Sequence, residues 1–143
     1  MDARLRLAST SVPSIRKEIQ IAAPPEKVWD ALRDFGALHE RLVPGFVTDC
    51  RMEGEDRIVT FTNGATYREV LIDSDDDARR LAWSIVDEPY EHHNGVAQVF
   101  PEGDGCLFVW TTDLIADDEV VTLTDQAMET GVGVVKKTLE AAG

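Results

Sequence analysis

The sequence has few of the residues that build metal centres and disulfide frameworks. Only two cysteines and three histidines occur among its 143 residues. Cys50 and Cys106 lie far apart in the chain, and neither has a second cysteine or a histidine at the spacing of a zinc site. Two isolated cysteines in a chain of this length are typical of a reducing compartment. We therefore expect a cytoplasmic protein that holds no metal and no other cofactor.

Long apolar runs and positive charge are also scarce. No stretch approaches the roughly 18 consecutive apolar residues that a membrane-spanning helix needs, and the apolar run near the start is too short for a secretory signal. Lysine and arginine number 14 against 27 acidic residues, so the formal net charge is −13. A surface this acidic repels phosphate backbones and anionic headgroups. We expect no nucleic-acid partner and no membrane insertion, and solubility is a sufficient reason for the charge.

Common metal-binding, nucleotide-binding and hydrolase motifs are missing as well. The acidic run at residues 73–77 begins like a calcium loop, but Ala78 and Ser84 stand where that loop needs glycine and glutamate. The glycines at positions 131 and 133 lack the third glycine and the preceding strand of a dinucleotide fingerprint. No G-x-S-x-G elbow occurs. We expect the acidic run to form an exposed turn.

The segment from residue 15 to residue 35 predicts a strand that leads directly into a helix. Ile19 and Ile21 have the period-2 spacing of a half-buried strand. Pro24 and Pro25 cannot continue a central ladder because proline lacks the backbone N–H, yet proline suits the first turn of a helix. Helical spacing then gives one apolar face, formed by Val28, Trp29, Leu32 and Phe35.

Six further strand-like segments follow a second short helical piece at residues 36–42. Turn residues separate them at even spacing, which is typical of an antiparallel meander. The Asn63-Gly64 pair is the clearest hairpin signal. With the first strand, the sequence predicts a seven-stranded antiparallel sheet. The six later strands are expected at residues 46–52, 57–62, 65–72, 80–86, 93–100 and 106–115.

The last segment, residues 117–142, predicts a long helix with a wide apolar face that the sheet must cover. Acidic residues at its start and Lys136 and Lys137 toward its end match the helix dipole. Gly131 interrupts the apolar face at a cost of about 0.5–1 kcal/mol relative to alanine. Either the glycine allows close packing against Trp83 or Trp110, which we favour, or it leaves room for a ligand.

These elements, taken in order, carry a resemblance to a known family. The segment IAAPPEKVWDALRDF resembles the opening of the START-like superfamily known as SRPBCC, which includes the polyketide cyclase/dehydrase type 2 family. RLVPGF, TNGATYREVLIDSDDDARRLAWSIV, HHNGVAQVF and WTTDL follow in the same order, so the resemblance covers roughly residues 15–141. It implies an α+β helix-grip fold, with the sheet wrapped around the C-terminal helix. It also implies a deep, mostly apolar cavity between them that binds a small hydrophobic molecule.

The middle of the chain most resembles bacterial relatives of the plant abscisic-acid receptors. The turn at residues 63–65 falls where those receptors have their gate loop, and residues 88–92 fall near the latch. Glu69 keeps one polar cavity residue of that family. The lysine, glutamate and asparagine of the receptor cavity are replaced, which implies a neutral ligand rather than abscisic acid; the replacements are Thr48, Phe108 and Gly131.

Catalysis would require groups that move protons. The candidates are Glu69, His93 and Asp113. Adjacent strand residues point to opposite faces, so only one of Arg68 and Glu69, and only one of His92 and His93, can face the cavity. For each candidate the alternative is a solvated or structural role.

Three hypotheses of function remain open. We favour a non-catalytic module that binds a lipid-, polyketide- or aromatic-like molecule, and the alternative is a cyclase or dehydrase that uses cavity carboxylates and histidine. A protein-partner role, known for SRPBCC proteins that assist chaperones, lacks sequence support. We expect residues 1–14 to be a flexible segment, residues 15–143 to form a single domain, and a homodimer to be possible. The expected ligand-binding residues are Phe35, Tyr67, Glu69, Trp83, His93, Phe108, Trp110, Thr124, Met128, Gly131 and Val135.

Overall fold

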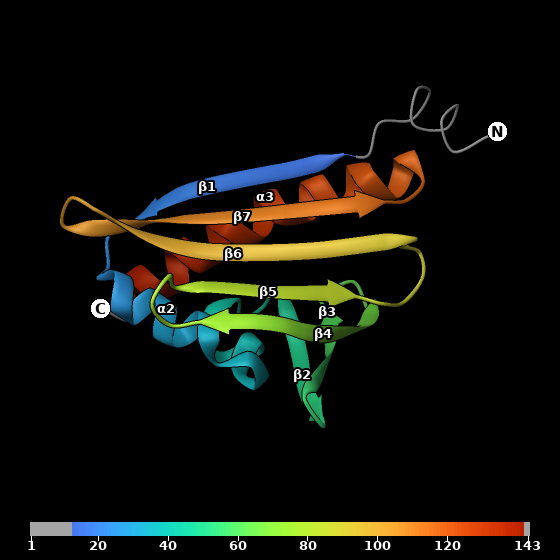
Figure 1. Ribbon diagram of the computed structural model, residues 1–143, viewed down its shortest axis with the longest axis horizontal. Coiled ribbons are helices and arrows are strands. Elements are labelled where there is room, and N and C mark those ends of the chain that lie inside the picture. The colour runs from blue at the N-terminus through green and yellow to red at the C-terminus, as the bar shows by residue number, and fades with distance from the viewer. Residues whose placement is uncertain (1–12, 142–143) are drawn as a thin grey trace.

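The computed structural model describes residues 13–141, and its elements follow the predicted order. Strand β1 is followed by helix α2, two short helical turns, six consecutive strands and one long helix (Figure 1). The flexible segment expected at residues 1–14 lies mostly outside the described residues, although Ser14 already belongs to β1. The bounds are β1 Ser14–Ile21, α2 Pro25–Arg33, η1 Phe35–Ala37, η2 Leu38–Leu42, β2 Val47–Glu53, β3 Asp56–Phe61, β4 Thr66–Asp75, β5 Arg80–Ile85, β6 His92–Glu102, β7 Gly105–Ile115 and α3 Asp118–Ala141.

The seven strands form one antiparallel sheet, which confirms the helix-grip expectation. The strand order is β1-β7-β6-β5-β4-β3-β2, so consecutive strands are neighbours except that β1 closes onto β7. Helix α3 runs along the sheet behind β1 and β7, whereas α2 contacts β5, β6 and β7 and the two short helical turns contact β2 (Figure 1). β1 is an edge strand of the described sheet, and a homodimer, through this strand or through the gate surface, stays a prediction.

The junction between β1 and α2 forms as its prolines predict. Pro24 is the N-cap residue and Pro25 occupies the first helical position, where no backbone N–H is needed. The apolar face of α2 is buried against the core at Val28, Trp29 and Leu32. Trp29 also donates a hydrogen bond from Nε1 to Asp76 Oδ1 at 2.9 Å, which ties α2 to the turn between β4 and β5.

Two strands are longer than the sequence predicted. β4 continues to Asp75, because Asp73 and Asp75 pair with Ala82 and Arg80 of β5 beyond a bulge after Leu71. Only the second half of the acidic run therefore belongs to the exposed turn. β6 continues to Glu102, because it pairs with β7 along its whole length. Sequence patterns miss such strand ends because the residues there are exposed, and a backbone ladder can form without burying their side chains.

Helix α3 buries its predicted apolar face. Thr124, Met128, Gly131 and Val135 are buried along this face, together with the flanking residues Val132 and Leu139. Leu123 lines the cavity described below and is nevertheless 57% exposed.

Candidate functional site

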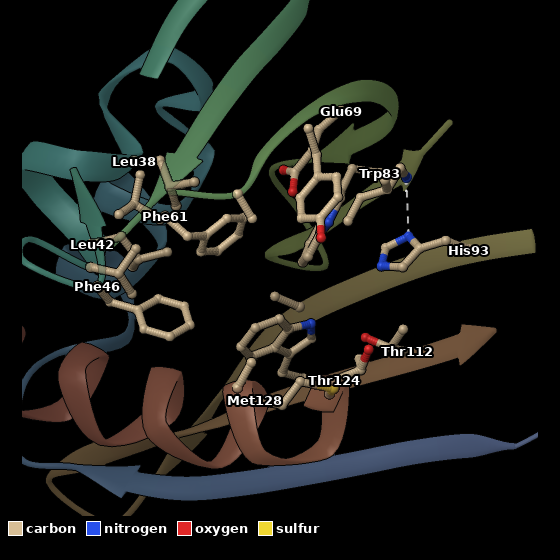
Figure 2. A pocket seen from close by; sticks show the side chains of 18 of the residues that line it. Leu38, Leu42, Phe46, Phe61, Glu69, Trp83, His93, Thr112, Thr124 and Met128 are labelled. Atoms are coloured by element: carbon tan, nitrogen blue, oxygen red, sulfur yellow. Dashed lines mark hydrogen bonds between the residues drawn. The ribbon is translucent and has the colours of Figure 1, made fainter. Parts of the chain in front are cut away.

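A cavity of about 480 Å³ lies between the sheet and helix α3. Residues of η2 and of six strands, β2 to β7, line it together with one face of α3. Figure 2 shows side chains from these elements turned toward a common space. Most of the wall is apolar, and the polar groups are few; apolar lining residues include Leu38, Leu42, Phe46, Phe61, Trp83, Phe108, Trp110 and Met128.

Nine of the eleven expected ligand-binding residues line this cavity. Phe35 and Gly131 do not, and each has a packing role instead. The Phe35 ring lies under the guanidinium of Arg57, with Cζ 3.9 Å from the ring centroid. A Cβ on Gly131 would lie 2.9 Å from Cζ3 of Trp110, so glycine is needed there for close packing. The nine are Tyr67, Glu69, Trp83, His93, Phe108, Trp110, Thr124, Met128 and Val135, and their role in binding stays a prediction.

The three catalytic candidates have different environments. Glu69 and His93 are buried and line the cavity. Asp113 is exposed on β7 and does not line the cavity; it accepts a hydrogen bond from Ser14 Oγ at 2.6 Å. Asp113 therefore has a structural role between β1 and β7. As expected for adjacent strand residues, only one of each pair faces the cavity. Arg68 lies on the other face of β4 from Glu69 and pairs with Asp56, and His92 is exposed.

Glu69 is held in a buried ion pair with Arg57. Both side chains are about 95% buried, and Arg57 reaches Glu69 Oε1 with its Nε at 2.8 Å and a terminal nitrogen at 2.7 Å. The other terminal nitrogen donates to the Phe35 carbonyl at 3.2 Å. The register places Arg57 of β3 opposite Glu69 of β4. The pair is neutral as a unit, and its hydrogen bonds offset part of the cost of removing two ions from water.

His93 is a neutral, oriented donor. Its Nδ1 accepts a hydrogen bond from the backbone N–H of Ile85 at 3.1 Å, so the ring proton resides on Nε2. Burial lowers the pKa of His93 to about 4, which keeps the ring uncharged near neutral pH. Figure 2 shows the dashed bond from Nδ1 and the other ring nitrogen turned toward the cavity.

A row of aromatic rings follows one side of the cavity. Neighbouring rings meet edge to face, with centroid distances of 5.0–6.1 Å, in the order Phe46, Phe61, Tyr67, Tyr90 and His93. The Tyr90 hydroxyl lies 2.8 Å from Thr124 Oγ1, and Thr124 donates to the Val120 carbonyl at 2.7 Å. Because a carbonyl can only accept, Tyr90 is the donor to Thr124. This bond joins the loop before β6 to helix α3.

Sequence reasoning missed several residues of the site. Arg57, Phe46, Phe61 and Tyr90 all line the cavity and were not among the expected residues. A signal existed for Arg57, since it shares the period-2 face of β3 with Val59 and Phe61. Tyr90 lies in a loop, and its contact with α3 has no periodic signature.

Between residues 13 and 141, no group of three or more His, Cys, Asp or Glu residues is placed to hold a metal ion. None of the helices in this part of the chain combines the length and the apolar composition needed to cross a membrane.

Comparison with solved structures identifies several relatives in fold. An uncharacterised protein from Bacillus thuringiensis is 20% identical, with a TM-score of 0.78, and the match covers 89% of this chain and 98% of that one. A START superfamily protein from Mycobacterium smegmatis is 12% identical, with a TM-score of 0.71 and coverage of 90% and 95%. Norcoclaurine synthase from Thalictrum flavum, in complex with dopamine and hydroxybenzaldehyde, is 20% identical, with a TM-score of 0.72 and coverage of 96% and 90%. At these identities the likeness shows the fold.

Comparison with known sequences identifies the family. No curated protein matches the sequence. A family model described as "Polyketide cyclase / dehydrase and lipid transport" matches residues 12–141, nearly the whole chain. This match shows that the chain belongs to the polyketide cyclase/dehydrase and lipid transport family.

Proposed function

We propose that this protein binds one small, uncharged, largely apolar molecule in the cavity between the sheet and α3. The observation that carries the proposal is the cavity itself, with its volume of about 480 Å³ and a wall made mostly of aliphatic and aromatic side chains. Pockets of about 300–1,000 Å³ with a few oriented polar groups are the usual form of small-molecule sites. The ligand class is lipid-, polyketide- or aromatic-like.

The state of the two buried candidates favours binding over proton transfer. Glu69 Oε1 accepts from two nitrogens of Arg57, so a proton taken up by this carboxylate would leave the buried guanidinium of Arg57 without its counter-charge. Nδ1 of His93 is occupied by the Ile85 N–H, and its Nε2 already carries the proton. A general base needs a free lone pair directed at the substrate. The cyclase or dehydrase alternative therefore has weaker support.

Native mass spectrometry of the protein purified from its source tests this proposal. The expected result is a retained molecule of a few hundred daltons that is released on denaturation and extracts into organic solvent. A panel of hydrophobic compounds should also raise the melting temperature, because a ligand that binds only the folded state stabilises that state. Recovery of ligand-free protein only, with no stabilisation by any compound of the panel, would contradict the proposal.

A further inference from the structure

Resting on the proposed function, a more specific inference concerns the ligand's polar group. We propose that the ligand carries one uncharged acceptor oxygen, of the carbonyl type. Donors on strands β6 and β7 hold this oxygen: the Nε2–H of His93 and the hydroxyl of Thr112, with the indole N–H of Trp110 beside them. The rest of the ligand lies along the aromatic row.

Two of these donors are buried and have no partner among the described residues. Oγ1 of Thr112 and Nε1 of Trp110 are both buried, and neither makes a hydrogen bond to another described group. Thr112 is only 1% exposed, and both side chains line the cavity. Buried polar groups of folded proteins are almost always paired, and an unpaired one is costly. The two groups therefore point to a bound partner that supplies an acceptor.

The strand register brings the three donors together. His93 pairs with Leu114, and the next inward-facing row of β6 and β7 pairs Gly95 with Thr112, so His93 and Thr112 are diagonal neighbours on one face. Trp110 precedes Thr112 by two residues on β7 and shares its face. Figure 2 shows His93 and Thr112 turned toward the same space. An oxygen placed there can accept two hydrogen bonds with its two lone pairs.

The charges around the cavity select a neutral oxygen over a carboxylate. Arg57 and Glu69 are the charged residues of the described wall, and they neutralise each other. A carboxylate next to His93 would be desolvated without a free cation, which is strongly unfavourable. The strongly acidic surface of the protein adds repulsion for an anion.

Bound water is the competing partner for these donors. A buried water can satisfy polar groups of this kind when it finds two to four partners. If water alone serves them, a carbonyl gains little by replacing it, and ligands with and without the oxygen bind equally. The ratio of the affinities of ligands with and without the oxygen therefore distinguishes a carbonyl site from a site served by water.

The test uses probes that share a body and differ in one group. The pairs are fluorene with 9-fluorenone and undecane with 6-undecanone, and fluorene-9-carboxylate is the anion. Affinity is measured by displacement of the neutral fluorescent probe N-phenyl-1-naphthylamine. We expect each ketone to bind more tightly than its hydrocarbon by about 2- to 10-fold for one net hydrogen bond, and the carboxylate to bind more weakly than 9-fluorenone.

Two matched variants assign the effect to Thr112. Thr112→Val keeps the shape of the side chain and removes the hydroxyl, so the affinity for 9-fluorenone should fall by about 2- to 10-fold while that for fluorene stays the same. Thr111→Val makes the same change on the opposite face of β7 and should alter neither. As a readout in the unmodified protein, the His93 Nε2 resonance in ¹⁵N spectra should shift with 9-fluorenone and not with fluorene.

The outcomes separate this inference from the proposed function. Equal affinity within each pair, or a Thr112→Val effect of the same size on 9-fluorenone and fluorene, would overturn the carbonyl site and leave an apolar binding module intact. Failure of N-phenyl-1-naphthylamine and every hydrocarbon and ketone to bind would overturn both. A ketone preference that Thr112→Val reduces and Thr111→Val leaves unchanged supports the inference.

Discussion

Burial determines the electrostatic properties of the charged and titratable residues in the cavity wall. Arg57 and Glu69 are charged groups in a mostly apolar wall, and His93 is a titratable ring held neutral by the same surroundings. Period-2 spacing predicted that one member of each adjacent pair, Arg68–Glu69 and His92–His93, would face the cavity. It could not say which member does, because the answer depends on the register with neighbouring strands.

Because Arg57 and Glu69 form a buried ion pair, removing one partner should cost more stability than removing both. Glu69→Leu leaves the guanidinium of Arg57 buried without compensation, so we expect a loss of about 3–5 kcal/mol in the free energy of unfolding. The double variant Arg57→Met, Glu69→Leu should recover most of that loss, because it removes both charges together. Urea denaturation of the two single variants and the double variant measures this coupling.

Arg68 provides the control for this experiment, since it pairs with Asp56 on the solvent side of β4. Arg68→Met should change stability far less than Glu69→Leu. Strictly additive losses in the double variant would show that Arg57 and Glu69 are not an energetic unit.

The depressed pKa of His93 predicts a loss of stability in mild acid. The unfolded chain binds a proton near pH 6.5, whereas the folded protein resists it down to about pH 4. Stability contributed by the neutral ring is therefore complete above pH 6.5 and declines as the pH falls from 6.5 toward 4, by about 2 kcal/mol at pH 5.

The variants His93→Gln and His92→Gln test this dependence. The advantage in stability of the unmodified protein over His93→Gln should shrink between pH 7.5 and pH 5, as measured by urea denaturation at each pH. His92 is exposed, so His92→Gln should keep the pH dependence of the unmodified protein. A constant difference between the unmodified protein and His93→Gln over this range would count against a neutral buried ring.

Among the elements, helix α3 shows how packing against the sheet overrides local propensity. Gly131 contacts Trp110 of β7 closely, whereas Gly133 is exposed and no atom lies within 4 Å of the position a Cβ would take. The helix and most strands could be predicted because their apolar residues repeat at fixed periods. The end of β4 could not, since an exposed acidic ladder has no periodic apolar signal.

The two glycines predict stability changes of opposite sign on one helix. Gly133→Ala should stabilise the protein by about 0.5–1 kcal/mol, because alanine is the better helix former. Gly131→Ala should destabilise it by about 1–3 kcal/mol, because its Cβ would lie 2.9 Å from the Trp110 ring. Thermal and urea unfolding of the two variants measure both values. A stabilising Gly131→Ala would contradict the close packing of α3 on β7.

For the molecule as a whole, the fold and the family followed from the order of its elements, whereas much of the site did not. The resemblance predicted a sheet around α3, and nine of the eleven expected ligand-binding residues line the cavity. Arg57 was missed although it shares the period-2 face of β3 with Val59 and Phe61. Tyr90 was missed because its place depends on a contact between distant segments, the loop before β6 and α3. Such contacts arise from tertiary packing and leave no local pattern in the sequence.

The most direct test of the central claim blocks the cavity without disturbing the core. Ala127 of α3 lines the cavity and is half-buried, while the adjacent Gln126 is exposed. Fluorescence titration with N-phenyl-1-naphthylamine should show saturable one-to-one binding to the unmodified protein and to Gln126→Trp, and at least a tenfold weaker affinity for Ala127→Trp, a loss of about 1.4 kcal/mol. Unchanged affinity in a folded Ala127→Trp variant would place the bound molecule elsewhere and contradict the account.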